Sequence, residues 1–251
     1  MPQPIPSSSN AKRSAVRSTI CTQDQTMSWL WTLAICAAWL ALPRLSSAAS
    51  FPCQKASTAV ERTICASKEI SELDEYLGRY YAAARSQMSH ANECLASNQR
   101  GWLRGVRDTC KDAVCLKAAY LQRLAELDGV QPGATALKNL QLPPTPTLVG
   151  ILPPAKDETA APPSSHLKPL AVQGRLVSEV AGGDGYVLVG KDGRKHLLVP
   201  LMLLDESTDA LQTLSQETAV TFLVRGQSGA GTSGKEDFAQ NKCRYIYRVP
   251  Q

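Results

Sequence analysis

The cysteines are the residues of this chain whose type and number most clearly predict chemistry. The 251 residues include eight cysteines, and those beyond residue 48 are Cys53, Cys65, Cys94, Cys110, Cys115 and Cys243. Such a set forms disulfides in an exported protein, whereas in a cytosolic protein it points to metal binding or redox chemistry. The compartment therefore has to be inferred first, and the N-terminal residues are the guide to it.

The start of the chain carries the features of an export signal. Residues 29–42 form an uncharged apolar run of 14 residues, which suits a signal-peptide core and is shorter than the roughly 18 residues that span a bilayer. Pro43 ends the run, and the small residues at 46–49 suit cleavage near Ala48 or Ala49.

We therefore expect residues 1–48 to be a signal peptide, with translation starting at Met1 or, if that start is over-extended, at Met27. An uncleaved membrane anchor is the alternative interpretation. Cleavage would leave a periplasmic or secreted protein with no stable membrane span. In that compartment the six remaining cysteines are expected to form disulfides.

The charge of the chain argues against a nucleic-acid partner. The formal net charge is +5, but residues 1–48 hold four of the 27 basic and one of the 22 acidic side chains, which leaves a nearly neutral remainder. Nucleic acids and anionic membranes are bound mainly through clustered positive charge. We predict no nucleic-acid binding, and the sequence contains no signal for the oligomeric state.

No arrangement of polar residues predicts catalysis. The histidines His90, His166 and His196 fall in separate elements, without a second metal ligand at a suitable spacing. No Ser-His-Asp or Cys-His set is evident either. Residues 229–235 resemble a phosphate-binding loop, but Glu236 follows them where Mg²⁺ coordination needs Ser or Thr. We predict an ordinary loop there, and a protein that is not an enzyme and holds no metal or cofactor.

Residues 51–128 predict a small antiparallel helical bundle. The stretches 58–61 and 71–74 are capping boxes, in which a side chain accepts a hydrogen bond from a free backbone N–H at a helix start. Two further helices, around Trp102 and around Tyr120, have apolar faces of their own. The long helix that the second box begins has these apolar residues on one face: Leu73, Leu77, Tyr80, Tyr81, Ala84 and Met88. Several amphipathic helices in so short a stretch bury their apolar faces against one another.

The sequence leaves the disulfide pairing open. An up-and-down path places Cys65 beside the turn between Cys110 and Cys115, which favours a bridge from Cys65 to that turn. A local Cys110–Cys115 bridge is the alternative. Cys94 and Cys243 either join the two halves of the chain, or one of them is a free thiol.

The motif spacing in the helical stretch resembles that of a known family. The pattern comprises Cys53, Ala56, Glu61, Ile64, Cys65, Ala66, Leu73, Asp74, Leu77, Tyr80, Gln99, Arg100, Trp102, Leu103, Arg107, Asp108, Cys110, Cys115, Leu116, Tyr120, Arg123 and Leu127. With this spacing, residues 51–128 resemble the LprI-type lysozyme inhibitor N-terminal domain. The family's cysteine positions are occupied by Cys53, Cys65, Cys110 and Cys115. Cys94 is additional.

The resemblance implies an exported, disulfide-stapled helical domain whose partner is lysozyme or another peptidoglycan hydrolase. The motif residues other than cysteine we interpret as mainly structural, because aromatic residues at helical spacing are more often core than recognition surface. Arg107 and its neighbour Asp108 form a helix-end ion pair in this interpretation. Gln99 and Arg100 belong either to a hydrogen-bond network or to a solvated face.

The remainder of the chain contains two stretches of different composition. Residues 129–166 contain eight prolines and predict a semi-extended linker, with 148–152 as its one apolar stretch. Residues 167–251 predict a β domain. Its expected strands are 170–180, 185–190, 195–201, 219–225 and 244–249, and its helix is 203–216. This strand-strand-strand-helix-strand-strand order is that of an OB-like β-barrel.

The predicted fold class is thus α + β in separate domains: a small disulfide-stapled antiparallel helical bundle, a Pro-rich linker and a small OB-like β-barrel. The predicted function is that of an exported binding protein that resembles lysozyme inhibitors. The alternative is an envelope structural or interaction module with no hydrolase target.

Overall fold

The computed structural model describes residues 49–131, 140–154, 167–179, 185–198, 205–230, 236–238 and 242–251. The predicted signal peptide, most of the predicted linker and most of the glycine-rich loop that resembles a phosphate-binding loop lie outside these residues. The chain from Ser47 to Gln251 forms one compact unit.

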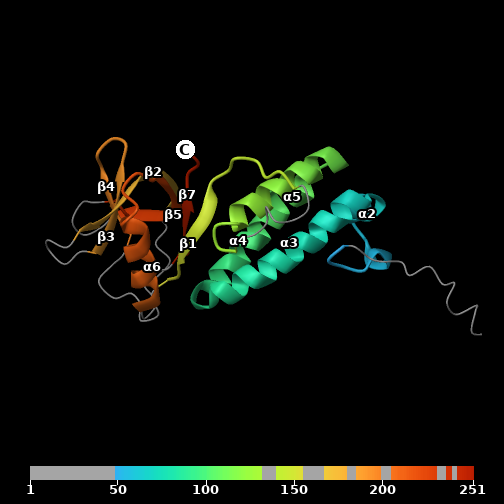
Figure 1. The fold of residues 1–251 in the computed structure, drawn as a ribbon, viewed down its shortest axis with the longest axis horizontal. Helices are drawn as coiled ribbons and strands as arrows, with labels where there is room; N and C mark the ends of the chain where they lie inside the picture. Colours follow the sequence, from blue (N-terminus) through green and yellow to red (C-terminus); the bar gives the residue numbers. More distant parts are fainter. Residues whose placement is uncertain are drawn as a thin grey trace, which may run out of the picture. The chain divides into compact units, whose positions relative to one another are not determined.

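The first part of the described chain is helical (Figure 1). Its elements are η1 (Cys53–Lys55), α2 (Ala59–Ala66), α3 (Lys68–Gln87), η2 (Ser89–Ala91), α4 (Asn92–Gly105), η3 (Arg107–Thr109) and α5 (Ala113–Leu127). The long helix α3 packs along α5 and also contacts α2 and α4. The predicted group of amphipathic helices is present.

The first predicted capping box is confirmed, and the second is wrong. The Thr58 hydroxyl accepts a hydrogen bond from the Glu61 N–H at 3.1 Å, and the Glu61 carboxylate accepts from the Thr58 N–H at 2.9 Å. The next helix, however, begins at Lys68 with Ser67 as its N-cap. Ser71 is buried inside that helix, where its hydroxyl donates to the Ile64 carbonyl at 2.8 Å. The helix starts one turn earlier than predicted because Ser67 caps it.

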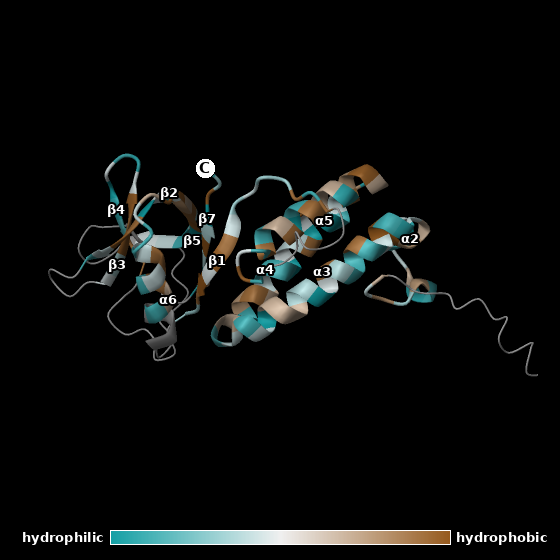
Figure 2. Ribbon diagram, viewed as in Figure 1, coloured by the Kyte–Doolittle hydropathy of each residue, from teal (hydrophilic) through white to brown (hydrophobic). Residues whose placement is uncertain are grey.

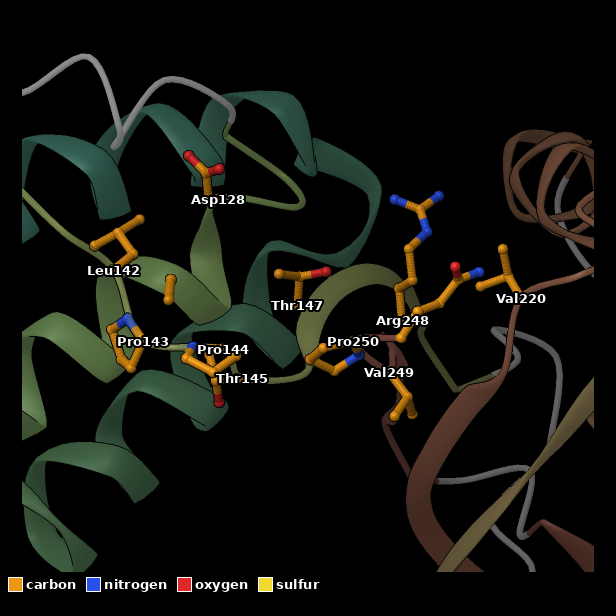
Figure 3. A pocket seen from close by; sticks show the side chains of 12 residues that line it. Asp128, Leu142, Pro143, Pro144, Thr145, Thr147, Val220, Arg248, Val249 and Pro250 are labelled. Atoms are coloured by element: carbon orange, nitrogen blue, oxygen red, sulfur yellow. The ribbon is translucent and has the colours of Figure 1, made fainter.

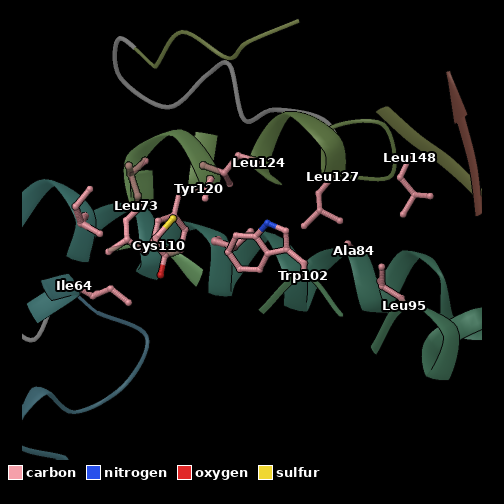
Figure 4. Close-up of a cluster of buried hydrophobic side chains, with 14 of the residues drawn as sticks. Ile64, Leu73, Ala84, Leu95, Trp102, Cys110, Tyr120, Leu124, Leu127 and Leu148 are labelled. Carbon is pink, nitrogen blue, oxygen red and sulfur yellow. The ribbon is translucent and has the colours of Figure 1, made fainter. Parts of the chain in front are cut away.

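The helices enclose a hydrophobic core (Figure 4). Several of its side chains have no exposed surface: Ile64, Ala84, Leu95, Leu116, Tyr120, Leu124 and Leu127. Figure 2 shows hydrophilic and hydrophobic residues side by side along α3 and α5, as expected for helices that bury one face. Leu148, Ile151 and Tyr247 belong to the same core although they lie in strands.

Three disulfides staple the described chain, and their pairing corrects the bridge favoured above. Cys53 pairs with Cys65, and Cys110 pairs with Cys115, so no bridge joins Cys65 to the turn. The reason is local: η1 contacts α2, which places Cys53 at a Cα–Cα distance of 5.7 Å from Cys65. Cys94 pairs with Cys243 over a separation of 149 residues. This last bridge joins the helices to the sheet.

The second part of the described chain is a mainly antiparallel sheet with one helix (Figure 1). Its elements are β1 (Thr147–Leu152), β2 (Lys168–Glu179), β3 (Gly185–Gly190), β4 (Lys195–Leu197), α6 (Asp205–Ser215), β5 (Phe222–Ala230), β6 (Glu236–Phe238) and β7 (Arg244–Arg248). The strand order is β1-β7-β5-β2-β3-β4-β6, and β6 also pairs with β5. The link between β4 and β6 is a single parallel pair, Leu197 with Asp237.

Strand β1 lies inside the stretch that the sequence predicts to be linker. It pairs antiparallel with β7, from Thr147 opposite Arg248 to Leu152 opposite Arg244. Its apolar side chains at 148, 151 and 152 are buried. Because two of these side chains enter the helical core, the helices and the sheet are packed together rather than held apart by a spacer.

The bridge across the two parts should contribute more to stability than the local bridge in the turn. Cys94→Ala with Cys243→Ala removes a constraint on a loop of 149 residues, and Cys110→Ala with Cys115→Ala one on a loop of 5 residues. Loop-closure entropy predicts losses of about 5 and about 2 kcal/mol in the free energy of unfolding. Urea denaturation of both double variants measures the difference. Equal losses would contradict the expectation.

Candidate functional site

The family-pattern residues are brought together inside the helical core, where they connect three helices. Trp102 of α4 lies edge-on against Tyr120 of α5, with ring centroids 5.7 Å apart. The guanidinium of Arg123, one turn further along α5, is 5.9 Å from the centre of the Trp102 ring. All three side chains are buried. This cluster holds α4 against α5.

Arg123 is a buried cation with a full set of partners. Only 1% of it is exposed, and its Nε and Nη2 donate to the Gln99 Oε1 at 3.0 and 2.8 Å. Its Nη1 lies 2.8 Å from a carboxylate oxygen of Glu126. A buried charge is tolerated only when it is paired and hydrogen-bonded. Gln99 and Glu126 meet that requirement, so these residues form a hydrogen-bond network.

A buried carboxylate on α3 binds the same cluster. Asp74 is 4% exposed, and its Oδ1 accepts a hydrogen bond of 2.7 Å from the Tyr120 hydroxyl. Burial and the nearby negative charge of Asp74 raise the pKa of Tyr120. The hydroxyl therefore remains protonated and donates to the carboxylate. On the other side, Asp74 Oδ2 accepts from Ser50, at the edge of the described residues.

Of the remaining pattern residues, Arg107 lies close to Tyr120, and its charge and hydrogen bonding act to lower the pKa of that hydroxyl. Arg100 is exposed. Arg107 forms an ion pair with Asp108, with 2.7 Å between Nη2 and Oδ1, at the end of α4. Asp74 was predicted to belong to the second capping box and to the family pattern, but it lies inside α3 rather than at its cap. It falls in helical register with the apolar residues Leu77 and Ala84, which is consistent with its burial. No role was predicted for Glu126.

A groove of about 400 Å³ lies where the helices meet the sheet. Trp102 and Gln122 line it from the helices, and Arg225 and Tyr245 from the sheet. The Tyr245 hydroxyl donates to the Cys94 carbonyl at 3.0 Å, which orients the ring. Together with the hydrogen bond from Asn98 Nδ2 to the Tyr247 hydroxyl at 3.3 Å, this bond holds the helices on the sheet.

A second hollow, of about 350 Å³, is formed by the prolines before β1 and the C-terminal residues (Figure 3). Pro143, Pro144 and Pro250 contribute apolar surface to it. Arg248 points along one side, where Glu217 binds its guanidinium with an Nε–Oε2 distance of 3.1 Å. Because the lining is mainly apolar and its arginine is already paired, this hollow offers little to orient a ligand.

The turn that precedes α5 presents a different kind of surface. Among the described residues, the large hydrophobic side chains that stay exposed are Val114, at 79%, and Val106, at 39%. The Cys110–Cys115 disulfide closes the turn between them, and Asp112 Oδ1 accepts from the Cys115 N–H at 2.8 Å. We call residues 106–115 the disulfide turn. Val114 lies within the bridged loop, next to the helix cap at Asp112, so its backbone is held in place by the disulfide and the cap.

Within the described ranges, no group of three or more His, Cys, Asp or Glu side chains is arranged to hold a metal ion. No helix in that part of the chain combines the length and the apolar character needed to cross a membrane.

The comparison with protein families decides how the helical part is classified. Residues 52–131 match the family model described as Lysozyme inhibitor LprI. The match runs from just before η1 to just after α5, so it covers the whole helical part, which we now call the LprI segment. The resemblance inferred from the motif spacing is confirmed for this segment. Searches among curated proteins and among solved structures found no match.

Removing the Tyr120 hydroxyl should destabilise the LprI segment. Tyr120→Phe keeps the packing against Trp102 but leaves the buried Asp74 Oδ1 without its donor. A loss of about 1–3 kcal/mol in the free energy of unfolding is expected. Tyr76→Phe is the matched control, since that partly exposed ring lies under Arg79 rather than in the core, and a change within about 0.5 kcal/mol is expected. Urea denaturation compares the two, and equal losses would argue against the network.

Proposed function

We propose that this protein is exported and inhibits a lysozyme-like glycan hydrolase by binding to it. The match of the whole LprI segment to a family described as a lysozyme inhibitor carries the proposal. The three disulfides are consistent with a compartment outside the cytoplasm. In this proposal the protein acts as a binding protein and performs no chemical step.

We propose the disulfide turn as the surface that contacts the hydrolase. An inhibitor has to place a protruding group in the substrate cleft, and a group held rigid before binding loses little conformational entropy on binding. Val114 is the most exposed large hydrophobic side chain of the described residues, and it lies inside the Cys110–Cys115 bridge. In this proposal the buried family-pattern residues contribute indirectly, because they fix the helices that carry the turn.

Charge has a small part in this binding. Residues 51–128 contain 11 basic and ten acidic side chains, so the LprI segment offers no strong field to attract a cationic hydrolase. Electrostatic steering mainly raises the rate of association. The affinity should therefore depend only weakly on salt, because apolar contact at the turn dominates it.

Lysis of a peptidoglycan suspension by lysozyme, followed as loss of turbidity, tests the function. The oxidised, mature full-length protein should slow the lysis in proportion to its concentration. An unchanged rate at a large molar excess would refute the inhibitor function. In that case a pull-down from the periplasm that recovers envelope proteins but no hydrolase would favour the alternative, an envelope interaction module.

A substitution in the turn tests the contact surface. Val114→Asp places a charge where apolar contact is expected, and it should weaken inhibition at least about tenfold. Ala82→Asp introduces the same charge at an exposed position of α3 and should leave inhibition unchanged. Both side chains are on helix surfaces, so circular dichroism should show the same helix content. Equal inhibition by the two variants would exclude the turn as the contact.

We also propose that the sheet curls into the OB-like barrel that the sequence predicts. The pairing of β6 with both β4 and β5 supports this, since it links the two sides of the β5-β2-β3-β4 segment. An experimental structure with a continuous β4–β6 ladder would establish closure. An unpaired edge at β6 would contradict it.

A further inference from the structure

The residues just after the predicted cleavage region are bound tightly to the helices. The Ser50 backbone nitrogen donates to Asp74 Oδ2 at 2.7 Å, and the Ser50 hydroxyl donates to the same oxygen at 2.5 Å. The Cβ of Ser50 lies close to α3, since a Cβ added to Gly78 would be 3.2 Å from it. Phe51 packs against the helical core. The segment 49–51 is thus a bound part of the fold.

Within the described residues, the carboxylate that receives Ser50 forms no ion pair, although the charge of Arg107 acts on its partner Tyr120. Asp74 is 4% exposed, and all of its hydrogen-bond donors are uncharged: the Ser50 N–H, the Ser50 hydroxyl and the Tyr120 hydroxyl. No lysine, arginine or histidine of the described residues forms an ion pair with it. Buried carboxylates usually have a cationic partner. The atom nearest to Asp74 Oδ2 that processing can convert into a cation is the Ser50 nitrogen.

We propose that cleavage leaves Ser50 as the first residue of the mature protein, and that its α-ammonium group forms an ion pair with the buried carboxylate of Asp74. Hydrolysis of the Ala49–Ser50 bond adds the oxygen of water to the Ala49 carbonyl and a proton to the Ser50 nitrogen. At neutral pH the new amine takes up a further proton. The bond to Asp74 then changes from a neutral to a charge-assisted hydrogen bond, which is roughly twice as strong.

The burial of Ala49 also determines whether cleavage comes before or after folding. Ala49 is 8% exposed and belongs to the helical core, although Ser50 itself is exposed. A peptidase cannot bind the Ala49 side chain while that side chain is packed in the core. The peptidase has to act before the LprI segment folds. Folding then draws the new N-terminus onto Asp74. An uncleaved chain can make only the neutral version of this contact, so processing is part of what stabilises the mature fold.

The proposal rests on the proposed export, and the first experiment separates the two. The protein is expressed with its own N-terminal residues and recovered from the periplasm, and its N-terminal sequence is determined. Ser50 as the first residue is expected. A mature protein that starts at Ala49 or further along the chain overturns this inference and leaves export intact, whereas an uncleaved protein that stays in the cytoplasm refutes export itself.

The second experiment tests the ion pair by comparing unfolding equilibria. The full mature chain beginning at Ser50 is compared with the same chain extended by Ala48 and Ala49, each with Asp74 and with Asp74→Asn. The free amine should lower the unfolding constant by about 10- to 100-fold relative to the extended chain. In the Asp74→Asn pair most of that difference should disappear. A difference that persists unchanged without the carboxylate overturns the ion pair.

A measurement on the unmodified mature protein covers the case in which Asp74→Asn does not fold. The pKa of the Ser50 α-amine, followed by NMR, should lie above the ordinary value of about 7.7–8.0, because Asp74 favours the charged amine. Tyr120 and Arg107 also face the site, and burial and the charge of Asp74 raise the pKa of Tyr120, so its hydroxyl stays protonated across that range. The extra stability should be complete below about pH 7.7 and decline as the amine loses its proton. An ordinary pKa overturns the proposal.

Discussion

The hydrogen bond between Tyr120 and Asp74 is the interaction on which the helical part depends. It joins α5 to α3 at the centre of the core, where a carboxylate that is 4% exposed would otherwise face apolar side chains. Leaving a buried polar group unpaired costs more folding free energy than its hydrogen bond contributes. Arrangements of the helices that separate Tyr120 from Asp74 are therefore disfavoured, and one arrangement is specified. Trp102 extends the contact to α4, since its ring packs against the same tyrosine.

The size of the helical part explains why it does not stand alone. Roughly 80 residues bury a small core, and domains of this size commonly add disulfides or further packing. Here two local bridges fix η1 to α2 and close the disulfide turn. The Cys94–Cys243 bridge and the side chains of Leu148 and Tyr247 then bring the sheet against the helices. The sheet supplies core that the helices lack, so the two parts stabilise each other.

Features that depend on residues close together in the sequence were predicted correctly, whereas features that depend on contacts outside the local pattern were not. The capping box at Thr58 was predictable because its partners are three residues apart, and the family pattern identified the helices for the same local reason. The second cap was misplaced because Ser71 bonds to Ile64 across a turn, a contact with no sequence signature. Strand β1 was missed because prolines surround it, and only its pairing with β7, some hundred residues later, makes it a strand. Both errors arose from contacts between residues whose proximity the sequence does not show.

The burial of the family pattern limits what the family match says about activity. Arg123 contacts both Gln99 and Trp102 inside the protein, so these residues serve the packing of the helices. A hydrolase can touch only what is exposed, and Val114 in the disulfide turn contributes nothing to that packing. Val114 can therefore be replaced while the helices keep their arrangement. A chain can match the family through its core and still differ in the exposed side chains that a partner would meet.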